Sequence, residues 1–172
     1  MQPSTALIVP VPEAEPVVGP WRATLDRAAS WGVPAHITVL YPFLAPGDID
    51  ETVLSALRQI AAAVPRFGCA LTHVGWFGER VVWLAPRPQE PLRDLTHAVW
   101  RRFPGAPPYG GAFDKVVPHL TVGHDAALPR LRRAADAVAA RLPVHAAVSS
   151  LRLISGSDAP GSWHTVAELP LG

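Results

Sequence analysis

Two short stretches of the sequence carry histidine and threonine in the same order. The first reads His36-Ile37-Thr38-Val39 and the second reads His119-Leu120-Thr121-Val122. Each begins just after a proline and alternates polar with apolar residues. A chain of this composition would contain about 0.08 such stretches by chance. Because there are two copies, the repetition indicates a shared function rather than coincidence.

The alternation within each stretch predicts a β-strand and fixes which side chains share a face. In a strand, residues i and i+2 point the same way. His36 therefore lies beside Thr38 on one face, and His119 lies beside Thr121. The apolar residues between them point to the other face, where they anchor the strand in the core. Each strand thus presents one imidazole and one hydroxyl.

Two imidazoles and two hydroxyls around one point suit displacement at phosphorus. Histidine can be an acid or a base near neutral pH because its ordinary pKa is about 6.5. One imidazole takes a proton from the attacking oxygen while the other donates one to the leaving oxygen. Threonine hydroxyls can donate hydrogen bonds to the phosphate oxygens. We therefore expect His36 and His119 to be catalytic and Thr38 and Thr121 to bind phosphate, with no metal and no cofactor required.

The competing interpretation is structural. A histidine on a strand is often half-buried, with its hydrogen bonds made within the protein, and threonine is common in strands. This interpretation is reasonable for either stretch alone. It is weaker for the pair, because coincidence would have to supply both copies.

The periodicity of the rest of the chain predicts the elements that position these stretches. Apolar runs and β-branched residues indicate strands, and a spacing of three to four residues indicates helices. Asp48 or Asp50 is expected to cap the second helix. The segment 12–20 is rich in proline and is expected to be a loop. The expected strands are 6–11, 35–40, 69–77, 80–85, 116–122, 144–154 and 163–169, and the expected helices are 21–30, 49–64, 91–103 and 129–142.

This order can be divided into two similar halves, each with a helix, a motif strand and a further helix. Hairpins and short connections favour antiparallel sheets, so we expect an α+β fold rather than a doubly wound parallel sheet. A pseudo-twofold axis between the halves would place the two motif strands around one point.

Length and composition limit the classes of protein to consider. The chain has 172 residues, 49% of them hydrophobic, and a net charge of +1. This predicts one domain over residues 1–172 and argues against both disorder and a generic nucleic-acid-binding surface. The single cysteine, Cys69, allows no intrachain disulfide and no cysteine-based zinc site. We find no signal peptide and no apolar run long enough for a membrane span, so a cytoplasmic protein is expected, with no membrane partner and no obligatory protein partner evident.

The two motifs resemble those of the 2H phosphoesterase superfamily, which includes the 2′-5′ RNA ligase-like proteins and the cyclic phosphodiesterases. The resemblance extends to the continuation Leu40-Tyr41-Pro42-Phe43 and to the length and motif order of the whole chain. It implies a bilobal α+β fold with two pseudo-symmetric lobes, a central cleft and no metal. It also implies opening of a 2′,3′-cyclic phosphate, on a small nucleotide or an RNA terminus, to a 2′-phosphate.

Three alternatives to this activity stay open. The same site could ligate RNA through 2′-5′ linkages, hydrolyse ADP-ribose cyclic phosphate, or bind a nucleotide or RNA end without turnover. The sequence also leaves open which histidine is the acid and which is the base.

A few residues outside the motifs could touch a substrate. By strand alternation Tyr41 belongs to the core face, so we expect it to pack rather than to line the cleft. His124 is expected in a solvent-exposed loop. Trp163 could form a rim but is expected in the core. Tyr109-Gly110-Gly111 lies in a Pro- and Gly-rich loop that could act as a lid.

Overall fold

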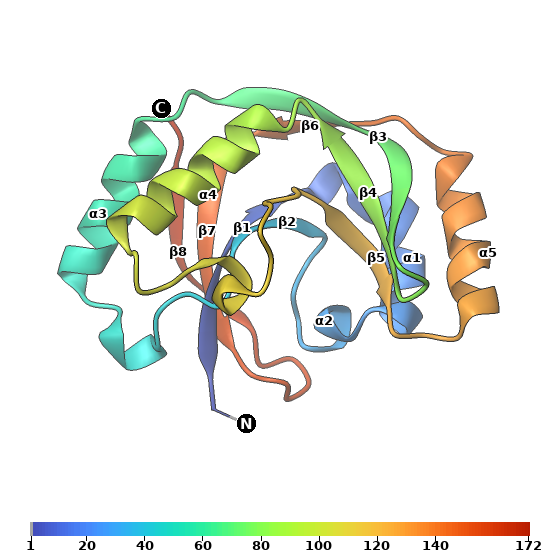
Figure 1. The fold of residues 1–172 in the computed structure, drawn as a ribbon, viewed down its shortest axis with the longest axis horizontal. Helices are drawn as coiled ribbons and strands as arrows, with labels where there is room; N and C mark the ends of the chain where they lie inside the picture. Colours follow the sequence, from blue (N-terminus) through green and yellow to red (C-terminus); the bar gives the residue numbers. More distant parts are fainter. Residues whose placement is uncertain (1) are drawn as a thin grey trace.

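The strands of the chain form one antiparallel sheet of eight strands, described here for residues 2–172 from a computed structural model (Figure 1). Across the sheet the order is β6-β3-β4-β5-β2-β1-β7-β8. The strands are β1 Ser4–Pro10, β2 His36–Leu40, β3 Phe67–Phe77, β4 Val81–Arg87, β5 Leu120–His124, β6 Val144–Val148, β7 Ser150–Gly156 and β8 His164–Pro170. The helices are α1 Glu15–Leu25, α2 Arg27–Ser30, α3 Glu51–Ala62, α4 Glu90–Arg102 and α5 Leu128–Ala139, with short 3₁₀ turns η1 Pro12–Ala14, η2 Pro46–Asp48 and η3 Pro108–Gly111.

The two motif strands lie at the centre of the sheet and join its two halves. β2 and β5 pair at a single position, where Ile37 lies opposite Leu120. On one side of this join are β1, β7 and β8 with α3 and α4, and on the other are β4, β3 and β6 with α1 and α5. Figure 1 shows these helices at opposite ends of the molecule. The bilobal α+β fold expected from the sequence is confirmed, although the two lobes share one continuous curled sheet.

The lobes are not the two halves of the sequence. Once the short helix α2 and strand β6 are set aside, the order β1-α1-β2-α3-β3 repeats as β4-α4-β5-α5-β7. Helix α1 of the first half packs against β5, and α4 of the second half packs against β2. Each motif strand is therefore supported by a helix from the other half of the chain.

Apolar side chains bury both faces of the sheet near the motifs. Ile37 and Leu120 are fully buried in the main core, together with Leu7 on β1. Each contributes about 1.5–3 kcal/mol by leaving water. A second, smaller cluster includes Ile8 and Ile154 and lies on the opposite face. Because both faces of β1 are buried, the strand next to the first motif is held rigidly.

The proline-rich segment 12–20 was wrongly expected to be a loop. Helix α1 already begins at Glu15. Pro16 lies in the first turn, where a helical N–H has no partner in any case. Pro20 cannot donate to the Pro16 carbonyl four residues back, and Arg141 Nη1 donates to that carbonyl instead, at 3.0 Å. A long-range contact therefore supplies the bond that proline removes.

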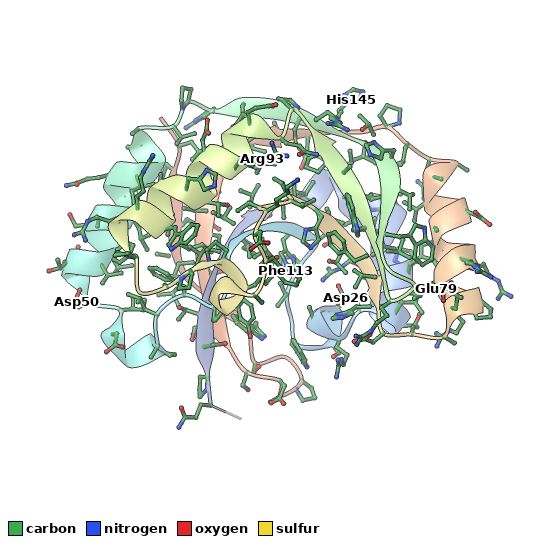
Figure 2. The ribbon with its side chains drawn as sticks, viewed as in Figure 1. Asp26, Asp50, Glu79, Arg93, Phe113 and His145 are labelled. Atoms are coloured by element: carbon green, nitrogen blue, oxygen red, sulfur yellow. The ribbon has the colours of Figure 1, made fainter. Side chains whose placement is uncertain are left out.

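Other elements begin or end differently from the sequence prediction. The expected strand 144–154 is two strands, because β6 pairs with β3 in one lobe while β7 pairs with β1 in the other. The second motif strand begins at Leu120, so His119 lies just ahead of it. The predicted cap of α3 is confirmed at Asp50 (Figure 2), whose carboxylate accepts from the Val53 N–H at 2.8 Å.

The single-point pairing of β2 with β5 makes one side chain of α4 important. The buried hydroxyl of Thr96 donates to the Val39 carbonyl of β2 at 2.7 Å. We predict that Thr96→Val lowers the free energy of unfolding by about 1–3 kcal/mol, because that buried carbonyl loses its donor. Chemical denaturation measures the change. Thr52→Val, on the exposed face of α3, is the matched control. An equal effect of the two substitutions would contradict the prediction.

Candidate functional site

The register of the central pair decides which motif residues face each other. Ile37 and Leu120 point into the core from directly opposite positions on antiparallel strands. The residues on either side of them along each strand must therefore point to the other face of the sheet. That face carries the polar residues of both motifs.

The antiparallel direction makes the pairing of the two motifs reciprocal. His36 lies on the same side of the central pair as Thr121, and Thr38 lies on the same side as His119. The two strands are paired at Ile37 and Leu120 alone among the described residues, so these side chains flank the join. All four side chains are partly buried, so the fold brings together the four residues singled out by the sequence.

Both imidazoles are oriented by the same local hydrogen bond. Nδ1 of His36 lies 2.7 Å from the Pro34 carbonyl, and Nδ1 of His119 lies 2.7 Å from the Val117 carbonyl. A carbonyl can only accept, so each Nδ1 carries the proton and donates it. In the neutral ring, Nε2 is then left with its lone pair. Both rings therefore present the same nitrogen for proton transfer.

Burial shifts both histidines toward the neutral form. The pKa of His36 falls from 6.5 to about 4, mainly because the ring is buried; the nearby charges of Arg22 and His119 act in the same direction, while the Pro34 carbonyl and Asp26 oppose the shift. Burial also lowers the pKa of His119, against the effect of its own carbonyl partner. Both rings are therefore neutral at pH 7 in the free protein.

Helix α1 holds the turn that precedes the first imidazole. The Ala35 N–H donates to the Glu15 carboxylate at 2.6 Å, and Arg22 Nη2 donates to the Val33 carbonyl at 3.1 Å. Arg22 is itself buried and paired with Asp26 at 2.9 Å. Sequence reasoning missed these supporting residues. The i,i+4 spacing of Arg22 and Asp26 was the available signal, but such pairs are usually surface pairs.

Aromatic side chains hold the second imidazole. The ring of Phe77 lies 5.0 Å from that of His119, and the ring of Trp83 lies 5.9 Å away, both edge to face. Trp83 also stacks on Phe77 and covers Gly75 so closely that a Cβ there would overlap its ring. This contact was also missed, because nothing in the sequence indicates that the β3–β4 hairpin reaches the second motif.

The loop ahead of the second motif packs on the first. The Tyr109 N–H donates to the Tyr41 carbonyl at 2.6 Å, and the Tyr109 hydroxyl is hydrogen-bonded to the side chain of Thr38. Burial raises the pKa of Tyr109, so its hydroxyl keeps its proton at neutral pH. The backbone of Tyr109 is left-handed, with φ 51°, which is uncommon for a residue with a Cβ. Its role as a lid stays a prediction.

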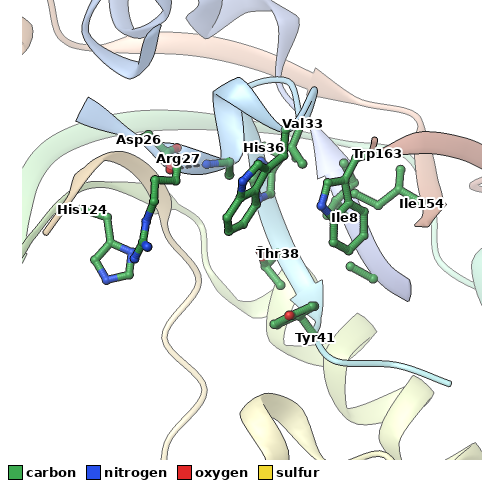
Figure 3. Close-up of a pocket in the computed structure, with 13 residues that line it drawn as sticks. Ile8, Asp26, Arg27, Val33, His36, Thr38, Tyr41, His124, Ile154 and Trp163 are labelled. Atoms are coloured by element: carbon green, nitrogen blue, oxygen red, sulfur yellow. Dashed lines mark hydrogen bonds between the residues drawn. The ribbon is translucent and has the colours of Figure 1, made fainter. Parts of the chain in front are cut away.

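A hollow of about 300 Å³ opens beside the first motif. Figure 3 shows His36 and Thr38 projecting into it from β2, with Tyr41 and Trp163 nearby. Its lining is mostly apolar and aromatic with a few polar groups, which is usual for a small-molecule site. The lining residues are Ala6, Ile8, Asp26, Arg27, Ala28, Trp31, Val33, His36, Thr38, Tyr41, His124, Ile154 and Trp163.

Three residues that the sequence placed outside the site border this hollow. Tyr41 was wrongly assigned to the core face. Strand β2 ends at Leu40, so the alternation stops there and Tyr41 is 39% exposed. His124 is solvent-exposed as expected, but it is the last residue of β5 rather than part of a loop, and it lines the hollow. Trp163 packs on the smaller apolar cluster and also forms a wall, with its ring 6.4 Å from that of Tyr41.

An acidic residue organises the polar side of the hollow. Asp125 binds Arg80 Nε at 2.6 Å and His124 Nε2 at 3.0 Å, and lies 3.9 Å from Arg27. The hydrogen bond from Arg80 is the main reason that the pKa of Asp125 is lowered. Asp125 thereby contacts two residues that line the hollow, Arg27 and His124.

Residues 2–172 contain neither a cluster of metal ligands nor a helix that could span a membrane. No three His, Cys, Asp or Glu side chains in this range gather as metal ligands would. No helix in the described part of the chain is both long and apolar enough to cross a membrane.

A curated relative matches about half of this chain. A protein of Geobacillus kaustophilus (strain HTA426), GK0864, whose name assigns it provisionally to the phosphoesterases, is 30% identical over 96 residues. The match spans 54% of this chain and about half (53%) of that relative.

Solved structures share the fold over nearly the whole chain. The structure of Escherichia coli LigT complexed with 3′-AMP matches with a TM-score of 0.61 and 21% identity, over 99% of both chains. The structure of TT0787 from Thermus thermophilus matches with a TM-score of 0.65 and 19% identity, over 98% of this chain and 97% of that one.

A family profile covers both motifs. The profile of the 2′-5′ RNA ligase superfamily matches residues 9–160, which include both histidine–threonine stretches and the helices that support them. With this match and the shared fold, the resemblance noted in the sequence is confirmed. The chain belongs to the 2′-5′ RNA ligase superfamily of 2H phosphoesterases.

Proposed function

We propose that this protein is a phosphodiesterase that opens a 2′,3′-cyclic phosphate, on a nucleotide or an RNA end, without needing a metal. The observation that carries the proposal is the pairing of Ile37 with Leu120, which turns the histidine and threonine of both motifs to the same face of the sheet. This arrangement supplies two proton-transfer groups and two hydroxyl donors around one point.

In the proposed reaction, His36 is the base and His119 is the acid. The lowered pKa of His36 keeps Nε2 free to accept a proton from water as the water oxygen bonds to phosphorus. The bond from phosphorus to the ribose 3′-oxygen breaks, and that oxygen takes the proton from Nε2 of His119. The product is a 2′-phosphate.

The charge of the phosphate prepares His119 for its role. In the free protein burial lowers its pKa, so few molecules carry the proton. A bound anion raises the pKa of a neighbouring imidazole and so favours its protonated form. The hydroxyls of Thr38 and Thr121 donate to the non-bridging oxygens, where negative charge gathers in the transition state.

The aromatic hollow beside His36 supports a nucleotide as substrate. A base could stack on the aromatic side chains that line it, which are Trp31, Tyr41 and Trp163. Arg27 lies at the entrance, where it would favour an anion. The crystal structure of LigT with 3′-AMP is consistent with nucleotide binding by this fold.

RNA ligation is the second candidate function. The family profile is named for 2′-5′ RNA ligation. In that reaction a 5′-hydroxyl replaces water as the nucleophile on the cyclic phosphate, and the same base and acid keep their roles as the bond to the 3′-oxygen breaks. A substrate panel separates the candidates. It holds the four 2′,3′-cyclic nucleotides, ADP-ribose cyclic phosphate, and RNA ending in a cyclic phosphate, with and without an acceptor 5′-hydroxyl.

We predict that His36→Ala and His119→Ala each lower kcat/KM on the preferred cyclic phosphate by at least about 10²-fold, because each removes a general acid or base. His145→Ala, on the exposed side of β6, is the matched control and should retain activity. EDTA should leave the rate unchanged. Full activity in either motif variant, or loss of activity with EDTA, would overturn the proposed mechanism.

Substitution of Gly75 should reduce activity without touching a motif. We predict that Gly75→Ala displaces Trp83, and with it His119, and lowers kcat by about 10- to 100-fold, since misplacement by about 1 Å can cost that much. Gly68→Ala, on the same strand, is the control because a Cβ there has room. Unfolding is measured in parallel. A Gly75→Ala enzyme as active as the Gly68→Ala control would be evidence against this support of His119.

A further inference from the structure

The turn that leads into His36 is held by two side chains of helix α1. Arg22 Nη2 donates to the Val33 carbonyl at 3.1 Å, and Oε1 of Glu15 accepts from the Ala35 N–H at 2.6 Å. Glu15 and Arg22 lie about two helical turns apart, so they project from the same face of the helix. We call these two residues the α1 clamp.

The α1 clamp pairs backbone groups on both sides of Pro34. Elsewhere in this turn the main chain pairs with itself, because the Val33 N–H donates to the Ala28 carbonyl and the Ala35 carbonyl accepts from the Val11 N–H. The Val33 carbonyl and the Ala35 N–H bond to the clamp instead. Both residues are buried, and buried backbone groups are nearly always paired. The clamp therefore ties the turn to the helix at two points.

The orientation of the first imidazole depends on this turn. The His36 ring donates from Nδ1 to the Pro34 carbonyl at 2.7 Å, which ties it only to a residue two places back. That bond fixes the ring relative to the turn, and the clamp fixes the turn relative to α1. Movement of the turn would therefore move Nε2 of His36 as well. His119 is held differently, because the rings of Phe77 and Trp83 contact its imidazole directly.

A buried ion pair fixes the direction of the Arg22 guanidinium. Its Nε donates to Asp26 Oδ2 at 2.9 Å, while Oδ1 of Asp26 accepts from the Ala28 N–H at 3.1 Å. Arg22 is only 3% exposed and Asp26 only 7%. Burial of two charges costs desolvation energy, so such a pair seldom adds stability by itself. Holding Arg22 toward the Val33 carbonyl is a role that explains the pair at this position.

The same pair places charge near the first imidazole. Asp26 and His36 line the same hollow (Figure 3). Burial is the main cause of the low pKa of His36, and the charge of Arg22 lowers that pKa further. Asp26 opposes this effect, and His119 of β5 adds to it. Loss of Arg22 would therefore raise the pKa of His36, because Asp26 would act without its partner.

We infer that Glu15 and Arg22 are positioning residues for His36, which hold the turn ahead of it so that Nε2 faces the proton it removes from the attacking water. Both act through the main chain rather than on a substrate. The inference rests on the proposed function for its catalytic consequence, because that function makes His36 the base. The fixed direction of the ring can be measured without a substrate.

Substitution of Glu15 tests the clamp at its more exposed member. We expect Glu15→Ala to lower kcat on the preferred cyclic phosphate by about 10-fold with little change in KM, because misplacement by about 1 Å can cost up to about 10²-fold. Glu15→Gln should recover most of this loss, since its amide oxygen can still accept from the Ala35 N–H. Glu13→Ala is the matched control, because Glu13 accepts the Ala147 N–H at 2.7 Å on β6, away from both motif strands.

Nuclear magnetic resonance of His36 tests the clamp without turnover. In the native protein the neutral ring should carry its proton on Nδ1, and in Glu15→Ala we expect a mixture of the two tautomers, which the ring ¹⁵N shifts distinguish. In Arg22→Met the pKa of His36 should rise toward its ordinary 6.5, and Arg22→Lys, which keeps the charge, should raise it less. Chemical denaturation confirms that each variant is folded. If the buried Arg22 cannot be replaced, the Glu15 variants decide the inference.

The results distinguish the clamp from the proposed function. A Glu15→Ala enzyme as active as Glu13→Ala, with an unchanged His36 tautomer, would overturn the clamp and leave the proposed function standing. Equal losses in Glu15→Gln and Glu15→Ala would also overturn it, because the hydrogen bond to Ala35 would then not be the cause. If the native protein turns over no cyclic phosphate, the proposed function is wrong, and the tautomer of His36 still decides whether the clamp orients the ring.

Discussion

The pairing of Ile37 with Leu120 is the constraint on which the site depends. This one position joins two four-stranded halves of the sheet, and its burial in the core sends the polar residues of both motifs to the opposite face. Because the strands are antiparallel, each histidine lies on the same side of this join as the threonine of the other motif. Beyond this position the strands are no longer paired with each other, so Thr96 must satisfy the Val39 carbonyl. The opening between the lobes follows from the same separation.

Burial gives the two histidines a charge state that the ligand can change. Desolvation holds both imidazoles neutral near pH 7, and their Nδ1–H groups are already committed to backbone carbonyls. The remaining nitrogen of each ring can only accept a proton until an anion arrives. A phosphate held by the threonine hydroxyls would stabilise a proton on one of the rings. The protein thus needs no fixed carboxylate next to either imidazole to produce one acid and one base.

The sequence predicted the parts of the site that depend on local pattern. Alternation identified both motif strands, and capping rules offered Asp48 or Asp50 as the cap of α3, of which the structure shows Asp50. The remaining parts depend on contacts between distant segments. Arg141 makes proline tolerable inside α1, and Glu15 of that helix holds the turn ahead of His36. Trp83 reaches His119 from the neighbouring hairpin. Tyr41 was misplaced because β2 ends one residue earlier, and strand alternation carries no signal for where pairing stops.

The pH dependence of kcat/KM tests the central claim, that two imidazoles of lowered pKa act as base and acid on one phosphate. This quantity reports ionisations of the free enzyme. The account predicts a bell-shaped profile whose limbs both lie below the ordinary histidine value of 6.5, with an optimum on the acid side of neutral. His36→Ala should remove the acidic limb, and His119→Ala should remove the basic limb. A profile that is flat from pH 4 to 8, or one that keeps both limbs in each variant, would contradict the account.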